Sequence, residues 1–76
     1  MREGPVLGEG ESAHVIAVRN VFEAYRIIAE QKARISALQA DGHATQGHEQ
    51  LLEILERRLR LLEDEERQLR AARDQA

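Results

Sequence analysis

The stretch "LQADGHATQGHEQLL", residues 38–52, decides the fold of this chain. Gly42 lies where one helical pattern stops, and glycine suits the left-handed position that closes many helices because it has no Cβ. Thr45 follows three residues later, and its hydroxyl can cap the first turn of a new helix. Gly42 and Thr45 therefore predict a hairpin turn, with residues 42–44 connecting two helices.

The composition indicates a small helical domain. Ala, Glu, Lys, Leu and Arg make up 42 of the 76 residues, which is typical of long helices and coiled coils. The chain has no Cys and therefore no disulfide or thiolate ligand. It shows neither a signal-peptide pattern nor the roughly 20 apolar residues that span a bilayer. We expect a cytoplasmic protein without a membrane segment.

Two helices follow from capping signals and apolar spacing. Glycines and the single proline in residues 1–11 predict a flexible N-terminal segment. Ser12 is the predicted N-cap of a first helix over residues 12–41, and a second helix is predicted over residues 45–73. Apolar residues recur at helical spacing in both: Val18, Val21, Tyr25, Ile28 and Ile35 in the first, and Leu52, Leu55, Leu59, Leu62 and Leu69 in the second.

The two apolar stripes fit one another when the chain folds back between His43 and Ala44. The predicted antiparallel pairs are Ile35–Leu52, Lys32–Leu55, Ile28–Leu59, Tyr25–Leu62, Val21–Glu66 and Val18–Leu69, with Gln39–His48 and His14–Arg73 at the two ends. This pairing predicts an all-α fold, an antiparallel two-helix hairpin of the coiled-coil type. Lys32 and Glu66 are polar seam positions, which either reach solvent or fix the register of the helices.

Further apolar residues lie outside these stripes and predict an oligomer. Phe22, Leu51, Ile54 and Leu61 are not needed for the seam of one hairpin. Contiguous exposed apolar surface usually marks a contact with a partner. The simplest partner is a second copy, so we expect a homodimer that forms a four-helix bundle with two-fold symmetry.

The histidines are weak candidates for chemistry. His43 and His48, with Asp41 and Glu49, could in principle ligate zinc, but His43 lies in the turn and the two histidines are five residues apart. His14 lacks the charged surroundings of a phosphoacceptor. No nucleophile–base set or phosphate-binding loop is present. We therefore predict no catalytic activity, no metal and no cofactor.

Nucleic acid is the alternative partner. Arg57, Arg58 and Arg60 could contact phosphates on one face of a helical hairpin dimer. Against this, glutamates stand four residues before Arg57 and Arg60, as i,i+4 pairs, and residues 41–76 carry six arginines against nine acidic residues. The net charge of −3 lies entirely in this half. We expect a protein–protein interaction module, with nucleic-acid binding as the less favoured hypothesis.

Residues 25–69 carry a pattern that resembles one found in other proteins. Ile28, Gln31, Ile35 and Leu38 precede the turn Asp41-Gly42-His43 with Thr45, and Leu51, Leu52, Leu55 and Leu59 follow it. The pattern resembles a group of small uncharacterised alphaproteobacterial helical-hairpin proteins with a DGH-T turn. Ala44 and His48 depart from that group, which often has aspartate and alanine there. The resemblance implies a hairpin and brings no assigned activity.

Overall fold

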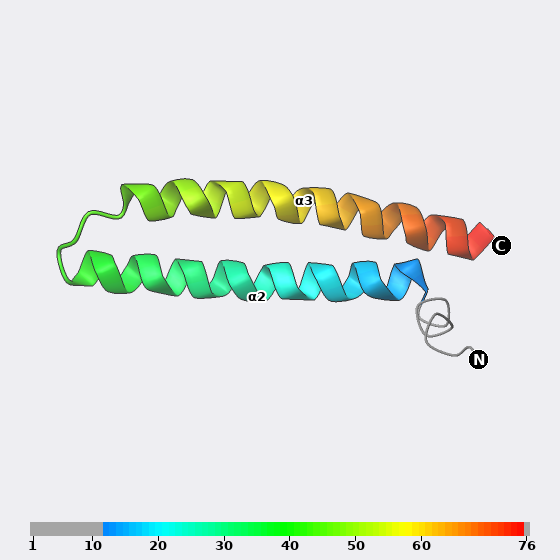
Figure 1. Ribbon diagram of the computed structural model, residues 1–76, viewed down its shortest axis with the longest axis horizontal. Coiled ribbons are helices and arrows are strands. Elements are labelled where there is room, and N and C mark those ends of the chain that lie inside the picture. The colour runs from blue at the N-terminus through cyan, green and yellow to red at the C-terminus, as the bar shows by residue number, and fades with distance from the viewer. Residues whose placement is uncertain (1–11, 76) are drawn as a thin grey trace, which may run out of the picture.

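The computed structural model describes residues 12–75, and these form two long helices joined by a short connection (Figure 1). Helix α2 spans Ala13–Ala40 and helix α3 spans Gln46–Gln75. The helices run antiparallel and pack against one another, so the predicted all-α hairpin is confirmed, with helix ends within two residues of the expected ones. The segment 1–11, predicted to be flexible, lies outside the described residues.

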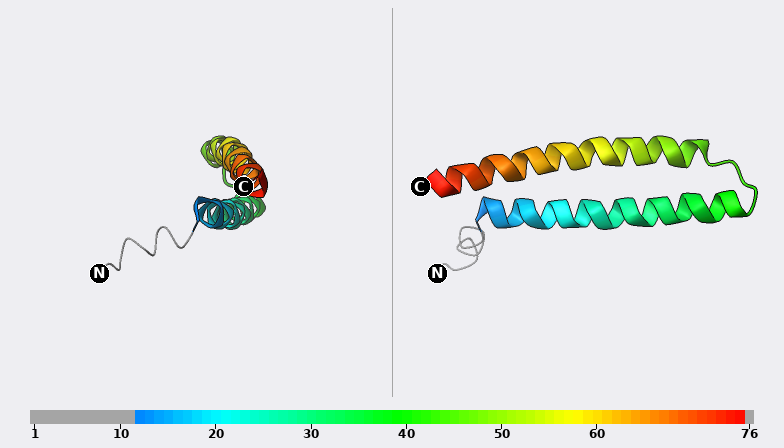
Figure 2. Two further views of the ribbon diagram at one scale, coloured as in Figure 1. Left: turned by 90° about the vertical axis from the view of Figure 1, so that its right-hand side faces the viewer. Right: turned by 180° about the vertical axis from the view of Figure 1, so that it is seen from behind.

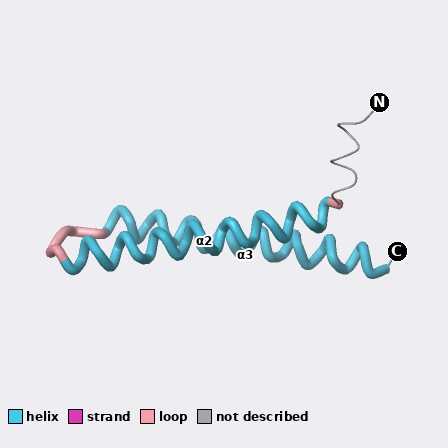
Figure 3. The backbone as a smooth tube through the Cα atoms, turned by 90° about the horizontal axis from the view of Figure 1, so that it is seen from below, coloured by secondary structure: helices cyan, strands magenta, loops and turns pink. Residues whose placement is uncertain are grey.

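The hairpin is elongated and a single layer of helix thick, with extents of 56 × 29 × 14 Å. Viewed end-on and from behind, the two helices remain side by side along their whole length (Figure 2). Seen from below, they cross one another at a shallow angle (Figure 3), as coiled-coil helices do. The layer has two broad faces, and residues 12–75 place no second layer on either of them.

The connection between the helices is closed by glycine, as predicted. Gly42 has a φ of 79°, and among residues 12–75 it is the position with a left-handed backbone. Its amide donates to the carbonyl of Gln39, and the amide of His43 donates to the carbonyl of Leu38. These two bonds define a Schellman motif, which satisfies carbonyls that the end of α2 would otherwise leave unpaired.

Both helix starts carry the predicted hydroxyl residue. The Ser12 hydroxyl accepts the amide of Val15 at 3.2 Å, which confirms its role as the N-cap of α2. The Thr45 carbonyl accepts the amide of Glu49, the first helical bond of α3. The Thr45 hydroxyl donates to the Glu49 carboxylate at 2.8 Å. Thr45 therefore stabilises the first turn of α3 through the side chain of Glu49, and not by accepting a backbone amide.

The seam between the helices follows a heptad spacing of alternating three and four residues. In α3 the inward positions from Leu52 to Leu69 are those predicted, and all of these are half-buried. In α2 the buried and half-buried positions at this spacing are His14, Ala17, Val21, Ala24, Ile28, Gln31, Ile35 and Leu38. The buried apolar core among residues 12–75 consists of Ala17, Ile28 and Ile35.

The predicted seam of α2 was wrong by one position over part of its length. Tyr25 and Lys32 are exposed, and the neighbouring Ala24 and Gln31 take the inward positions. Alanine lets two helices approach closely, and the Gln31 amide finds hydrogen-bond partners across the seam. A lysine ammonium at the same place would be buried without a counter-charge, which costs far more than a paired amide.

Candidate functional site

Gln31 is the polar residue at the centre of the seam near the turn. Its side chain is 2% exposed, and its Nε2 donates to the backbone carbonyl of His48 at 2.9 Å. Its Oε1 accepts from Nη1 of Arg34 at 2.9 Å. His48 was predicted to face Gln39 and instead contacts Gln31. Because both ends of the amide are paired, Gln31 links α2 to α3 at one register.

A second polar group holds the start of α3 against the end of α2. The Gln39 amide donates to the Glu49 carboxylate at 3.3 Å and lies 3.5 Å from the Thr45 hydroxyl. Thr45 itself is buried. His43 is exposed in the turn and is not part of this group. The residues weighed as zinc ligands thus have partners in the hairpin: Glu49 bonds to Thr45 and Gln39, and His48 contacts Gln31.

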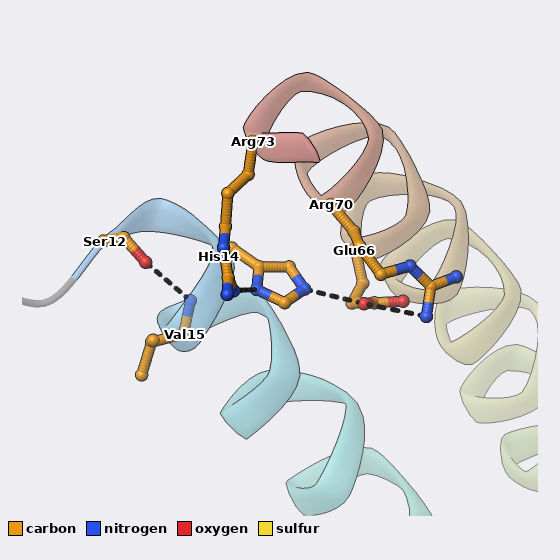
Figure 4. A network of polar contacts seen from close by, with 6 residues as sticks. All are labelled: Ser12, His14, Val15, Glu66, Arg70 and Arg73. Atoms are coloured by element: carbon orange, nitrogen blue, oxygen red, sulfur yellow. Dashed lines mark hydrogen bonds and ion pairs between the residues drawn. The ribbon is translucent and has the colours of Figure 1, made fainter. Parts of the chain in front are cut away.

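A third polar group lies at the open end of the hairpin, where the predicted contact between His14 and Arg73 is confirmed (Figure 4). Nη1 of Arg73 lies 3.1 Å from Nδ1 of His14, and Nε2 of His14 lies 2.9 Å from a Glu66 oxygen. Arginine can only donate, so Nδ1 accepts and the ring proton lies on Nε2, from which it is donated to Glu66. Arg70 completes the group, 3.8 Å from Glu66.

Tyr25 crosses from one helix to the other on the surface. Its hydroxyl donates to the Glu63 carboxylate at 2.5 Å. The hydrogen bond to this carboxylate, with the charge of Glu63 beside it, raises the pKa of Tyr25 above its ordinary value. The ring is half-exposed, so the contact lies over the seam and not inside it. This bond marks one broad face of the hairpin.

A shallow hollow between the helices marks the opposite face. It is lined by Asn20, Glu23, Ala24, Ile27, Leu55, Arg58 and Leu62. Ile27 lies two residues after Tyr25, and residues two apart on a helix point about 200° away from each other. The hollow and the Tyr25–Glu63 bond are therefore on opposite faces of the single layer.

The predicted interface residues divide between these two faces. Leu51, Ile54 and Leu61 line up with Arg58 at helical spacing and lie on the face of the hollow; with Ile27 they form what we call the Leu61 face. Phe22 lies three residues before Tyr25 and therefore belongs to the other face, which we call the Phe22 face and which also carries Val15. Phe22 and Leu61 are each 70% exposed.

The arginines predicted as a nucleic-acid contact do not form one cluster. Arg57 and Arg60 line a shallow depression with Leu61 and Asp64, whereas Arg58 lines the hollow between the two helices. The predicted ion pairs from Glu53 to Arg57 and from Glu56 to Arg60 are not formed in the described part of the chain. Further along α3, the i,i+4 pair from Glu66 to Arg70 is formed, and Arg67 pairs with Asp64.

Residues 12–75 offer neither a metal site nor a membrane span. No group of three or more His, Asp or Glu side chains is placed there to hold a metal ion. Neither α2 nor α3 is long and apolar enough to cross a membrane. No family model matches the chain, and no curated protein or solved structure matches it significantly.

Proposed function

We propose that this protein is a small, non-catalytic protein–protein interaction module of the cytoplasm. Its hairpin pairs with a second copy, so that four helices form an antiparallel bundle. The exposed residues Phe22, Leu51, Ile54 and Leu61 supply contact surface to this homodimer or to a further protein partner. The proposal requires neither a metal nor a cofactor.

One contrast in burial supports the proposal. In residues 12–75 the buried apolar residues are Ala17, Ile28 and Ile35, whereas eight large apolar side chains are exposed. They are Val15, Ile16, Phe22, Tyr25, Ile27, Leu51, Ile54 and Leu61. A single layer of two helices offers its seam residues only one partner helix, so apolar side chains beside the seam stay in water until a second layer covers them.

The polar groups of the hairpin support a structural role. Gln31, the Thr45–Glu49 pair and His14–Glu66 each link two elements or hold a helix end. Their hydrogen-bonding atoms are directed at other atoms of the same chain. This arrangement is suited to holding two helices in register, which is what a module that presents helix faces requires.

Sedimentation equilibrium of the whole chain at micromolar concentration tests the proposal. We expect about twice the mass of the 8.6-kDa chain. Ile54→Glu should shift the mass toward one chain, because it puts a charge into the contact surface. Gln50→Glu, one turn earlier on the same helix and exposed, is the matched control and should leave the mass doubled. A wild-type mass of one chain would contradict the proposal.

The unpaired arginines favour one alternative function. Arg57, Arg58 and Arg60 form no ion pair within the described residues, which leaves them available to phosphates in a nucleic-acid-binding hairpin dimer. Retention of RNA or DNA at about 50 mM salt, lost in the triple variant Arg57→Gln, Arg58→Gln, Arg60→Gln, would support this alternative. Absence of retention by the wild-type chain would dismiss it.

A further inference from the structure

The two faces of the hairpin differ in how their apolar residues are distributed between the helices. On the Leu61 face both helices contribute, with Ile27 from α2 and Leu51, Ile54 and Leu61 from α3. On the Phe22 face the exposed apolar residues come from α2 alone. There α3 presents charged residues at the positions flanking the seam: Glu49, Glu56, Glu63 and Arg70.

This difference decides which face can form a four-helix bundle. In such a bundle each helix packs apolar side chains against two neighbours, so both helices of a protomer must contribute to the contact. The Leu61 face meets that requirement. On the Phe22 face a second copy would take the glutamates of α3 out of water. Burying these charged carboxylates is unfavourable, because the hydroxyl donors of Glu49 and Glu63 carry no counter-charge.

The hollow on the Leu61 face strengthens the case for a second copy. Its lining includes apolar residues of both helices, Ala24, Ile27, Leu55 and Leu62. Glu23 and Arg58 stand beside them, so the lining holds one charge of each sign. A surface that meets its own copy about a two-fold axis must be complementary to itself, and opposite charges on the same surface allow each to meet its opposite.

The size of the face is sufficient for a stable dimer. Helices of 28 and 30 residues are about 42–45 Å long at 1.5 Å per residue, and two of them side by side are about 20 Å wide. The face therefore offers about 800 Å², which is the area that each partner buries in a stable protein–protein contact of standard size.

From these observations we infer that the homodimer forms through the Leu61 face alone and leaves Phe22 on the outside of the bundle. The inference rests on the proposed homodimer and narrows it: of the two faces, one is the dimer contact and the other stays in solvent in the assembled bundle. It also removes Phe22 from the predicted interface, which the sequence analysis assigned to Phe22 together with three residues of α3.

Two substitutions test this inference because their positions are matched. Leu61 and Phe22 have the same exposed fraction in the hairpin. Leu61→Glu should raise the dimer dissociation constant by about 100-fold or more, since two-fold symmetry places the charge twice in the contact. Phe22→Glu should change that constant by less than about threefold, the range of an ordinary surface substitution. Sedimentation gives the constants, and circular dichroism checks that both variants are helical.

A second measurement avoids placing a charge in the contact. The natural chain has no cysteine, so Leu61→Cys and Phe22→Cys each introduce a single thiol. At concentrations where the wild type is dimeric, an uncharged maleimide should label the thiol of Phe22→Cys at least about tenfold faster than that of Leu61→Cys. Dilution below the dissociation constant should remove the difference, because both positions are exposed in the separate hairpin.

The outcomes separate the inference from the proposed function. A dimer that dissociates with Phe22→Glu and persists with Leu61→Glu overturns the inference and leaves the homodimer in place. Dissociation by both variants, or equal labelling of both thiols in the dimer, also overturns it. A wild-type chain that is monomeric overturns the proposed homodimer itself.

Discussion

At the scale of single residues, polar side chains decide how the two helices meet. Gln31 is buried in the seam with its donor and acceptor both paired, whereas Lys32 beside it is exposed. Tyr25 reaches over the surface to Glu63, and His14 joins Glu66 and Arg73 at the open end. Each contact joins α2 to a definite position of α3, so a shift of register would leave buried polar atoms without partners.

The position of Gln31 predicts different effects for two neighbouring substitutions. Gln31→Ala should lower the free energy of unfolding by about 1–3 kcal/mol, because it removes a buried hydrogen bond and leaves unfilled volume in the seam. Lys32→Ala should change it by less than about 0.5 kcal/mol, as is usual at an exposed position. Denaturation by guanidinium chloride measures both values. A larger loss of unfolding free energy for Lys32→Ala than for Gln31→Ala would indicate that Lys32 lies in the seam.

The hydrogen bond from Tyr25 predicts a pH effect. Glu63 raises the pKa of Tyr25 in the folded chain, so this bond contributes stability that is complete below the ordinary tyrosine pKa of about 10. The contribution is lost as the pH rises through the raised pKa, because the phenolate can no longer donate and repels Glu63. Absorbance titration is specific because the chain has one Tyr and no Trp. Glu63→Gln should bring the midpoint down toward the ordinary value, and identical midpoints would contradict the contact.

At the scale of the helices, the helix ends could be predicted from local signals, but the rotation of each helix about its own axis could not. Ser12 and Gly42 act on backbone atoms, and Thr45 on the Glu49 side chain, all within a few residues, so the sequence located the helix ends and the turn. Val18 and Tyr25 are apolar and one heptad apart, which suggested that they face inward. Whether Tyr25 or Ala24 does so depends on contacts with α3, where small side chains and the partners of Gln31 are decisive.

The two glycines near the turn predict effects of opposite sign. Neither would bring a new Cβ within 4 Å of other atoms, so only the backbone matters. Gly42→Ala should lower the free energy of unfolding by about 1–2 kcal/mol, because its φ of 79° is unfavourable for a residue with a Cβ. Gly47→Ala lies in the first turn of α3 and should raise it by as much as about 1 kcal/mol. Equal effects would contradict the role given to Gly42.

At the scale of the whole molecule, the candidate site could be predicted as a set of residues but not as a surface. The sequence singled out Phe22, Leu51, Ile54 and Leu61 because none is needed in the seam. It could not divide them, since which face each residue occupies depends on how α2 and α3 are turned toward one another. The contact of Tyr25 with Glu63 and the lining of the hollow by Ile27 and Arg58 supply that orientation.

A homodimer predicts that stability depends on protein concentration. Mass action favours the folded dimer, and a tenfold increase in concentration is worth about 1.4 kcal/mol per dimer. Shared between two chains of this size, that corresponds to an increase in Tm of about 3–6 °C. Ile54→Glu should remove most of the dependence. Circular dichroism melts over two decades of concentration measure it, and a constant wild-type Tm would show that folding is not coupled to association.

The antiparallel course of the helices also has a practical consequence. The start of α2 and the end of α3 lie at the same end of the hairpin, and the connection between the helices lies at the other (Figure 1). If the hairpin were inserted into a surface loop of a carrier protein, the chain would leave and re-enter the carrier at neighbouring points. It would then project as a stalk about 40 Å long, with its tip far from the carrier.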